Sequence, residues 1–221
     1  MTTQQGWHQG LPFPSMETEL KLSLRPQDVP ALLAHPLLTT PAKVQRLLNT
    51  YFDTPALDLK QRRMAVRERL AGAEWLLTVK TAGKSENGLS RRQEWEATTT
   101  PGALNFAALV DDAELAASLM ALRAELKPLF RTDFERQSWV LTHNSASIEV
   151  ALDLGHITVP GTALSEDILE LELELLIGPE AALHGLADAL RQTPSGVIAL
   201  TPSDASKAQR GLALFAQSAQ G

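Results

Sequence analysis

The sequence Glu17-Thr18-Glu19-Leu20-Lys21-Leu22-Ser23-Leu24 alternates between polar and apolar side chains. With the two-residue period of a β-strand, the polar face carries Glu17, Glu19, Lys21 and Ser23. In an ordinary half-buried strand such a face simply points to water. Taken alone, this strand favours that interpretation, but the same pattern returns in later segments and changes the balance.

The composition sets the class of protein. The chain has 221 residues, 44% of them hydrophobic, enough for one large packed domain or two small ones. It has no cysteine, which excludes disulfides and thiolate sites and fits a reducing compartment. No apolar run is long enough for a membrane span, and the N-terminus lacks a secretory signal. We expect a cytoplasmic protein without membrane contact, made of a disordered lead-in (1–15), one domain (16–216) and a tail (217–221).

The charge balance argues against a nucleic-acid partner. The formal net charge is −6, and the chain has no lysine-rich or arginine-rich run. Proteins that bind duplex nucleic acid usually present a basic face. An anionic ligand would therefore need positive charge concentrated in one place, against the overall balance.

Alternation and turn residues predict many strands and fewer helices. The expected strands cover residues 17–24, 50–54, 64–70, 74–81, 89–98, 129–142, 146–154 and 166–177, and Gly155 is expected to end the seventh. Helices are expected over residues 26–36, 103–126, 179–192 and 204–215, with Asp204 as the cap of the last. Residues 42–48 fit either a short helix or the beginning of a strand.

The segment Gly83-Lys84-Ser85 resembles the end of a phosphate-binding P-loop. Thr78 stands where that motif needs its first glycine, and the segment joins two strands rather than opening a helix. We therefore expect an ordinary loop.

Six of the expected strands have a charged or polar face opposite an apolar face. Two architectures fit this pattern: a core of apolar faces with solvated charges, or a closed barrel with its charges inside and helices packed outside. The faces are nearly pure in charge, and three aligned glutamates repel one another unless cations lie near. We therefore predict an α+β fold, a closed barrel with a charged interior and helices outside. The charged sets are Glu17/Glu19/Lys21, Arg67/Arg69, Arg92/Glu94/Glu96, Glu149/Asp153 and Glu170/Glu172/Glu174.

These residue types indicate a ligand class. Arginine makes planar, bidentate contacts with phosphate. Carboxylates without cysteine or clustered histidine suit hard cations such as Mg²⁺ or Mn²⁺. Arginines and lysines that face glutamates across a cavity indicate a metal-bridged polyphosphate.

Several motifs, in order along the chain, resemble the CYTH superfamily of triphosphate tunnel metalloenzymes, and the inorganic triphosphatases of bacteria most closely. The resemblance covers residues 16–216, and its motifs are Glu17-x-Glu19-x-Lys21, Tyr51-Phe52-Asp53-Thr54-Pro55, Arg67-Glu68-Arg69, Leu77-Thr78-Val79-Lys80, Arg92-Gln93-Glu94, residues 130–136, residues 148–155, residues 170–175 and Ser206-Lys207-Ala208-Gln209-Arg210-Gly211. It implies a closed eight-stranded antiparallel barrel that forms a tunnel. It also implies hydrolysis of tripolyphosphate to diphosphate and phosphate with Mg²⁺ or Mn²⁺.

The resemblance also assigns roles to residues. Those expected to bind the phosphate chain are Lys21, Arg67, Arg69, Lys80, Arg92, Arg136 and Lys207. Those expected to hold metal are Glu17, Glu19, Glu170 and Glu172, with Glu174, Asp153 and Glu149 as further candidates. The expected catalytic set is Lys21, Arg67, Arg69 and Glu94, in which Glu94 holds the basic side chains or a second metal ion.

Other functions on the same barrel stay open. They are hydrolysis of nucleoside or thiamine triphosphate, a class IV-type adenylate cyclase, and a polyphosphate-binding module without turnover. Some members of the superfamily carry a helical CHAD domain after the tunnel; the sequence shows none, so we expect a stand-alone version or a shortened chain. The sequence does not indicate an oligomeric state.

Overall fold

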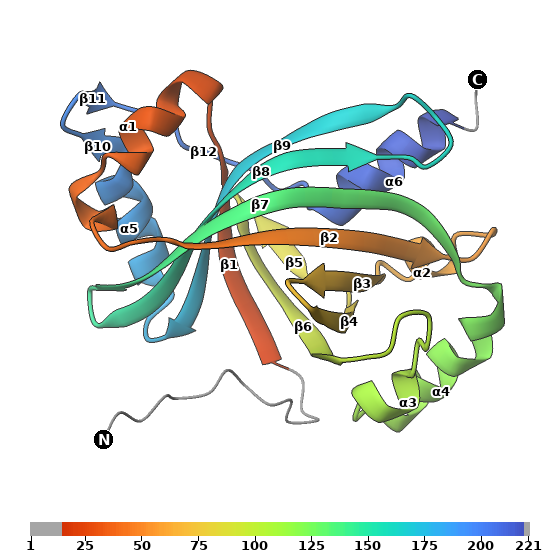
Figure 1. Cartoon of the computed structure of the whole chain (residues 1–221). Coiled ribbons are helices and arrows are strands. Elements are labelled where there is room, and N and C mark those ends of the chain that lie inside the picture. The colour runs from red at the N-terminus through yellow and green to blue at the C-terminus, as the bar shows by residue number, and fades with distance from the viewer. Residues whose placement is uncertain (1–14, 219–221) are drawn as a thin grey trace.

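Antiparallel strands close into a barrel in this computed structural model, which describes residues 15–218 (Figure 1). The order around the barrel is β1-β9-β8-β7-β2-β3-β4-β6, and β6 pairs with β1 to close it. The strands are β1 (Ser15–Ser23), β2 (Lys43–Asp53), β3 (Ala65–Ala71), β4 (Glu74–Lys80), β6 (Leu89–Thr98), β7 (Lys127–His143), β8 (Ala146–Thr158) and β9 (Ser165–Ile177). The predicted closed eight-stranded barrel is confirmed. The expected lead-in and tail lie outside the described residues, apart from Ser15 and residues 217 and 218.

Helices and short strands surround the barrel. The helices are α1 (Val29–Leu33), α2 (Asp58–Gln61), α3 (Phe106–Leu109), α4 (Ala113–Leu122), α5 (Ala181–Arg191) and α6 (Lys207–Ser218), and the short strands are β5 (Lys84–Glu86), β10 (Gln192–Thr193), β11 (Gly196–Val197) and β12 (Thr201–Pro202). Figure 1 shows α1 and α5 together at one side and α2 and α6 towards the opposite end. Within residues 15–218, no helix is long and apolar enough to cross a membrane.

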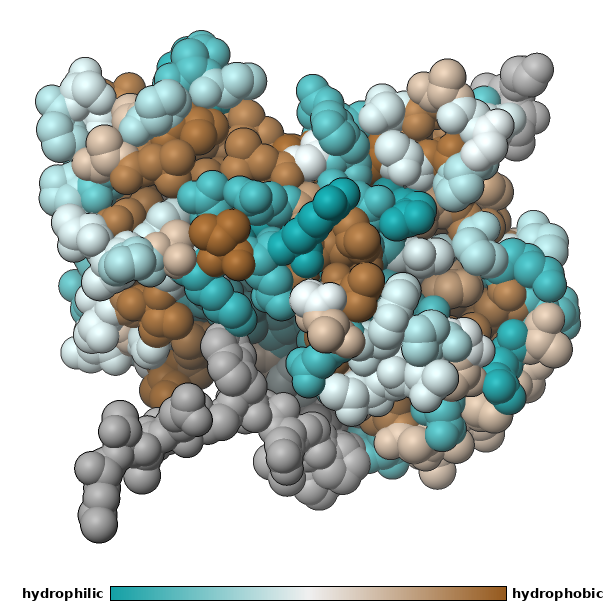
Figure 2. Space-filling view, in the orientation of Figure 1, coloured by the Kyte–Doolittle hydropathy of each residue, from teal (hydrophilic) through white to brown (hydrophobic). Residues whose placement is uncertain are grey.

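The apolar faces of the strands point outward and pack under the helices. Leu22 and Leu171 are fully buried against Leu186 of α5 in one cluster, and Val79 and Trp95 are buried with Phe106 of α3 in another. Burial of each such side chain contributes about 1.5–3 kcal/mol. Figure 2 shows hydrophilic side chains across the middle of one face, between regions richer in hydrophobic ones. Because the apolar faces point outward to the helices, the alternation leaves the charged faces inside the barrel.

Three expected elements differ in length. Of residues 42–48, all but Ala42 belong to β2, a single long strand, because pairing with both β3 and β7 holds it extended. The helix expected over 103–126 is divided into α3 and α4, because Asp112 caps a new helix by accepting from the Leu115 amide at 3.0 Å. The helix expected over 26–36 is reduced to α1, with 3₁₀ turns at Pro26–Asp28 and Pro36–Leu38 on either side.

Gly155 does not end its strand, so that prediction is wrong. Strand β8 continues to Thr158, and Gly155 pairs with Phe134 of β7. A Cβ at Gly155 would lie 2.2 Å from the Asp133 carbonyl oxygen and 2.5 Å from the Phe134 Cα. Glycine is present here because the two backbones approach too closely for a side chain.

Asp204 does not cap α6, so that prediction is also wrong. Ser206 is the cap: its hydroxyl accepts from the Gln209 amide at 3.2 Å, and Gln209 Oε1 accepts from the Ser206 amide at 2.8 Å. This reciprocal pair forms a capping box. Asp204 instead accepts from the Gly88 amide at 2.9 Å and the Ser85 hydroxyl at 2.7 Å. Asp204 therefore links the segment before α6 to β5 and to the residues between β5 and β6. The segment that resembles a P-loop does not open a helix, as expected, but the expected loop is wrong at its end, because Lys84 and Ser85 belong to β5 and pair with β6.

Helix α6 packs against the barrel through Gly211. A Cβ at this position would lie 2.0 Å from the Phe130 ring, which stacks on the Tyr51 ring at a centroid distance of 4.7 Å. Alanine has the higher helix propensity by about 1 kcal/mol, but overpacking costs about 1–3 kcal/mol. We expect Gly211→Ala to lower the melting temperature by several degrees and to reduce any activity that depends on α6. Calorimetry checks this, with Gly185→Ala in α5 as the control, because its nearest atoms belong to two movable side chains. An unchanged melting temperature for Gly211→Ala would contradict the packing.

Candidate functional site

The inner faces of the strands surround an open cavity of about 1150 Å³. All seven basic residues that the resemblance assigned to phosphate line it: Lys21, Arg67, Arg69, Lys80, Arg92, Arg136 and Lys207. They come from β1, β3, β4, β6, β7 and α6. Every second residue of each strand points into the barrel. The alternating residues of several strands therefore meet in one site.

The expected carboxylates are divided between the lining and the layer beneath it. Glu17, Glu19, Glu94, Glu172 and Glu174 line the cavity. Asp153 and Glu170 are not exposed to it, because Lys207 covers them. Glu149 does not line the cavity either; it lies opposite Glu174 in the pairing of β8 with β9.

One ion-pair cluster joins β1, β4 and β6. Lys80 Nζ lies 2.9 Å from Glu17 and 2.8 Å from Glu94, while Arg92 lies 2.6 Å from Glu17 and 3.0 Å from Glu19. Burial opposes the ionisation of Glu17, but Lys80 and Arg92 outweigh it and hold its pKa well below the usual range. Burial raises the pKa of Glu94 despite Lys80. The cluster therefore combines a firmly ionised carboxylate with one that takes up a proton more readily.

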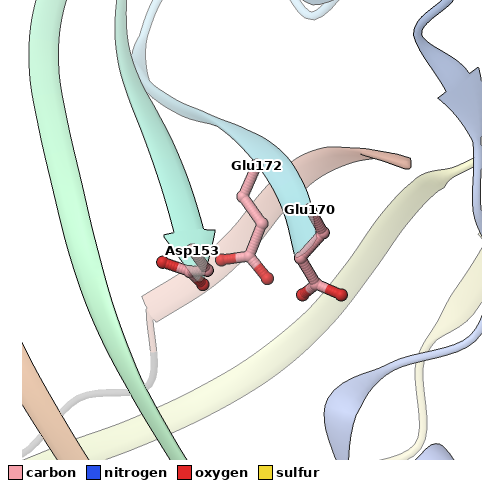
Figure 3. A group of neighbouring side chains, drawn as sticks. All are labelled: Asp153, Glu170 and Glu172. Atoms are coloured by element: carbon pink, nitrogen blue, oxygen red, sulfur yellow. The ribbon is translucent and has the colours of Figure 1, made fainter. Parts of the chain in front are cut away.

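A second cluster gathers three carboxylates of β8 and β9. Figure 3 shows Asp153, Glu170 and Glu172 pointing toward one another, with one oxygen of each within 4.8 Å of the others. Lys207 Nζ lies 2.6 Å from Asp153 and 2.9 Å from Glu172, and it also pairs with Glu170. Arg136 lies 2.7 Å from Asp153 and 2.5 Å from Glu172.

This second cluster fits a hard divalent cation. Its ligands are carboxylate oxygens only, which is the donor set of Mg²⁺ and Mn²⁺. The Lys207 ammonium already lies within reach of all three carboxylates, and these carboxylates, despite the opposing effect of burial, raise its pKa well above the usual range. A bound metal ion and this ammonium would compete for the same oxygens.

Arg67 and Arg69 differ in their partners. Arg67 donates to the Thr78 hydroxyl at 3.0 Å and to Glu96 at 3.1 Å. Arg69 donates to Asn49 Oδ1 at 2.7 Å and makes no ion pair within residues 15–218. Burial, with Arg67 nearby, lowers the pKa of Arg69 to about 10, so it stays protonated at neutral pH. Arg69 is therefore a half-buried cation that faces the cavity with no carboxylate at ion-pair distance, and Glu96 acts on it only from farther away.

Glu174 is a carboxyl group of the cavity lining with a raised pKa. Burial, reinforced by the neighbouring Glu17, raises its pKa to about 8. At neutral pH it is mostly protonated in this arrangement, and a nearby metal ion would favour its ionised form.

Several lining or neighbouring residues were missing from the sequence-based set. Tyr51 and Glu96 line the cavity, and Phe134 lies under Lys207 at 4.8 Å from ring centroid to Nζ. Glu96 belongs to a predicted charged face but was given no role, and Phe134 is in phase with Arg136, so the alternation did carry a signal for both. Tyr51 lies in an expected strand and a quoted motif but was given no role in the site. Asn49 was missed because it lies between residues 42–48, which could not be told from a helix, and the expected strand.

A family model described as the CYTH domain matches residues 15–211. The chain belongs to the CYTH domain family. The resemblance inferred from the motifs is therefore confirmed. The chain is 34% identical over 207 residues to the inorganic triphosphatase of Haemophilus influenzae, a match that covers 90% of this chain and 54% of that protein. The chain thus spans about half the length of this curated CYTH relative.

Solved structures share the fold at low identity. A Hippeastrum protein named for adenylyl cyclase and described as having a dominant triphosphatase activity has a TM-score of 0.60 and 21% identity, over 92% of this chain and 96% of that chain. A Pyrococcus horikoshii protein has a TM-score of 0.57 and 17% identity, over 89% and 98% of the two chains. A Bacillus halodurans protein named for adenylate cyclase has a TM-score of 0.55 and 21% identity, over 89% and 97%. These likenesses show the fold alone.

Proposed function

We propose that this chain hydrolyses inorganic tripolyphosphate to diphosphate and phosphate with the help of Mg²⁺ or Mn²⁺. The observation that carries the proposal is the convergence of all seven expected phosphate-binding cations on one cavity that also holds oxygen-only carboxylate clusters. The similarity to a relative named inorganic triphosphatase supports this substrate over other triphosphates. The absence of cysteine fits the proposed cytoplasmic location.

The basic residues bind and orient the substrate in this proposal. Arg69, which has no carboxylate partner, and Arg67 offer guanidinium groups to the phosphate oxygens. Lys21, Lys80, Arg92, Arg136 and Lys207 complete the cationic lining. Their fixed positions supply orientation and charge stabilisation, which are the main needs of phosphoryl transfer. Glu94 acts by positioning, since it lies 2.8 Å from Lys80 and 3.9 Å from Arg67.

The carboxylates explain why a divalent cation is needed. Most of the lining cations are already paired, so the tunnel alone offers little free positive charge to a strongly anionic substrate. When a carboxylate binds a metal ion instead of its arginine or lysine partner, that basic side chain becomes available to bind phosphate. The residues proposed to hold metal are Glu17, Glu19, Glu170 and Glu172, with Glu174, Asp153 and Glu149 nearby. When bound, the metal supplies charge neutralisation and an oriented water.

A competition experiment separates the proposed substrate from its alternatives. Phosphate release is measured with tripolyphosphate, ATP or thiamine triphosphate alone, and then with two of them together. We expect tripolyphosphate to give the highest kcat/KM and to suppress turnover of ATP. A preference for ATP would move the chain to a nucleotide enzyme on the same barrel, and formation of cyclic AMP would identify a cyclase.

Arg69→Ala is expected to weaken both binding and turnover, because it removes a lining cation that has no carboxylate partner. Among the basic residues of the barrel's inner face, Arg69 is free of the ion pairs that engage its neighbours, so we expect kcat/KM for tripolyphosphate to fall by about 10²-fold, the usual effect of losing one charge-stabilising donor. Steady-state kinetics measures this, with Arg46→Ala on the exposed outer side of β2 as the control. Wild-type kinetics for Arg69→Ala would remove this residue from the proposed site.

A further inference from the structure

The rim of the cavity carries three basic side chains that the proposed reaction does not use. Lys60 of α2, Arg63 just after it and Lys84 of β5 line the cavity, yet all three are exposed. They lie outside the inward faces of the barrel strands. The same cavity is lined by Ser206 and Lys207 at the start of α6, and Figure 1 shows α2 and α6 towards the same end of the barrel.

The rim cations are unpaired, in contrast to most cations inside. Within residues 15–218, no carboxylate forms an ion pair with Lys60, Arg63 or Lys84. Asp204 is the carboxylate that also lines this side, and its oxygen is already bonded to the Gly88 amide and the Ser85 hydroxyl. The rim therefore has a net positive charge that is available to bind an anion.

The fold positions the segments that carry these residues without any ligand. Asp53 accepts from the backbone amides of Leu59 at 2.8 Å and Lys60 at 2.9 Å, which fixes α2 to the end of β2. Arg63 has a left-handed φ of 56° and donates to the Gly83 carbonyl at 3.3 Å. This bond joins the segment after α2 to the segment before Lys84, so the backbone that carries the three cations is positioned before substrate arrives.

The shape of the cavity favours a longer phosphate chain over a nucleobase. Its volume of about 1150 Å³ exceeds the roughly 300–1,000 Å³ of pockets that hold drug-sized ligands, so three phosphates fill only part of it. The aromatic residues in its lining, Tyr51 and Trp95, are buried and offer no exposed ring for base stacking. Charge, by contrast, continues from Lys80 and Arg92 outward to the rim.

We propose that Lys60, Arg63 and Lys84 form an outer anion subsite that binds the distal phosphates of linear polyphosphates longer than tripolyphosphate. The inference rests on the proposed function, since the terminal phosphates must lie in the tunnel for the distal ones to reach the rim. Tripolyphosphate itself is held by the tunnel cations and does not need the rim.

The test compares two triple variants of the whole chain by isothermal titration calorimetry with Mg²⁺ present. The first is Lys60→Gln/Arg63→Gln/Lys84→Gln. The matched control, Arg46→Gln/Arg123→Gln/Lys127→Gln, removes the same charge from exposed positions that do not line the cavity. The probes are tripolyphosphate and a medium-chain linear polyphosphate. We expect the rim variant to bind the longer chain about tenfold more weakly than the control, with the affinity for tripolyphosphate changed less than twofold.

Two outcomes would overturn the proposal. Equal affinity of both variants for the longer chain would show that the rim does not contact it. An equal loss for both probes would show that the rim acts only as a general attraction for anions. If the wild-type chain binds neither probe, the proposed function itself fails, and this result is distinct from the other two.

Discussion

Glu172→Gln is expected to lower the kcat for tripolyphosphate hydrolysis by about 10²–10³-fold while changing the affinity for the anion much less. Glu172 is a half-buried carboxylate of the cavity lining that contacts Arg136 at 2.5 Å and Lys207 at 2.9 Å. Burial opposes its charge, but Lys207 and Arg136 lower its pKa well below the usual range, so it is ionised at neutral pH. Glutamine keeps the shape but removes the charge that a metal ion needs.

The experiment separates catalysis from binding. Phosphate release gives kcat, calorimetry gives the affinity for tripolyphosphate, and the melting temperature shows that the variant folds. Glu135→Gln is the matched control, because Glu135 is an exposed glutamate of β7 that does not line the cavity. A Glu172→Gln variant with wild-type kcat would show that the carboxylate cluster of β8 and β9 takes no part in the reaction.

Lys207→Met is expected to lower the melting temperature strongly when no metal is present. The ammonium is the shared partner of Asp153, Glu170 and Glu172, and its loss leaves buried carboxylates with too little positive charge. Removing one member of a buried ion pair costs about 3–5 kcal/mol, although Arg136 retains contacts with Asp153 and Glu172 and moderates the loss here.

Added Mg²⁺ should then raise the melting temperature of Lys207→Met by more than it raises that of the wild type. The reason is linkage: the metal ion no longer competes with an ammonium for the same oxygens, so it binds the folded state more tightly. Thermal unfolding with and without Mg²⁺ measures the difference, and Lys127→Met, at an exposed position of β7, is the control. An equal effect of Mg²⁺ on both proteins would indicate that this cluster holds a lysine and not a metal.

The barrel and its inner face could be predicted from the sequence because both depend on a local signal. The two-residue period assigns Arg67, Arg69 and the glutamates of β9 to one face without knowledge of the partner strand. The family motifs then extend this to a closed barrel. Residues 42–48 failed because a short run with mixed polarity fits both periods, and the structure resolves it only through pairing with β3 and β7.

Other features depend on contacts between distant segments. Gly155 looked like a strand end, since the closeness of Phe134 is not visible in the sequence. Asp204 looked like a helix cap until its bonds to Gly88 and Ser85 were seen. The sequence named Lys207 as a phosphate ligand, but its place among three carboxylates follows from the docking of α6, which Gly211 permits. The individual roles of these site residues stay predictions.

The most direct test of the central claim is phosphate release from tripolyphosphate by the purified chain, with Mg²⁺ and with a chelator in excess. The account predicts rapid release of one phosphate per tripolyphosphate, with diphosphate as the other product, and loss of this activity in the chelator. Release that continues unchanged in the chelator would contradict the proposed role of the carboxylates. Tight binding without release would show that the tunnel binds polyphosphate and does not hydrolyse it.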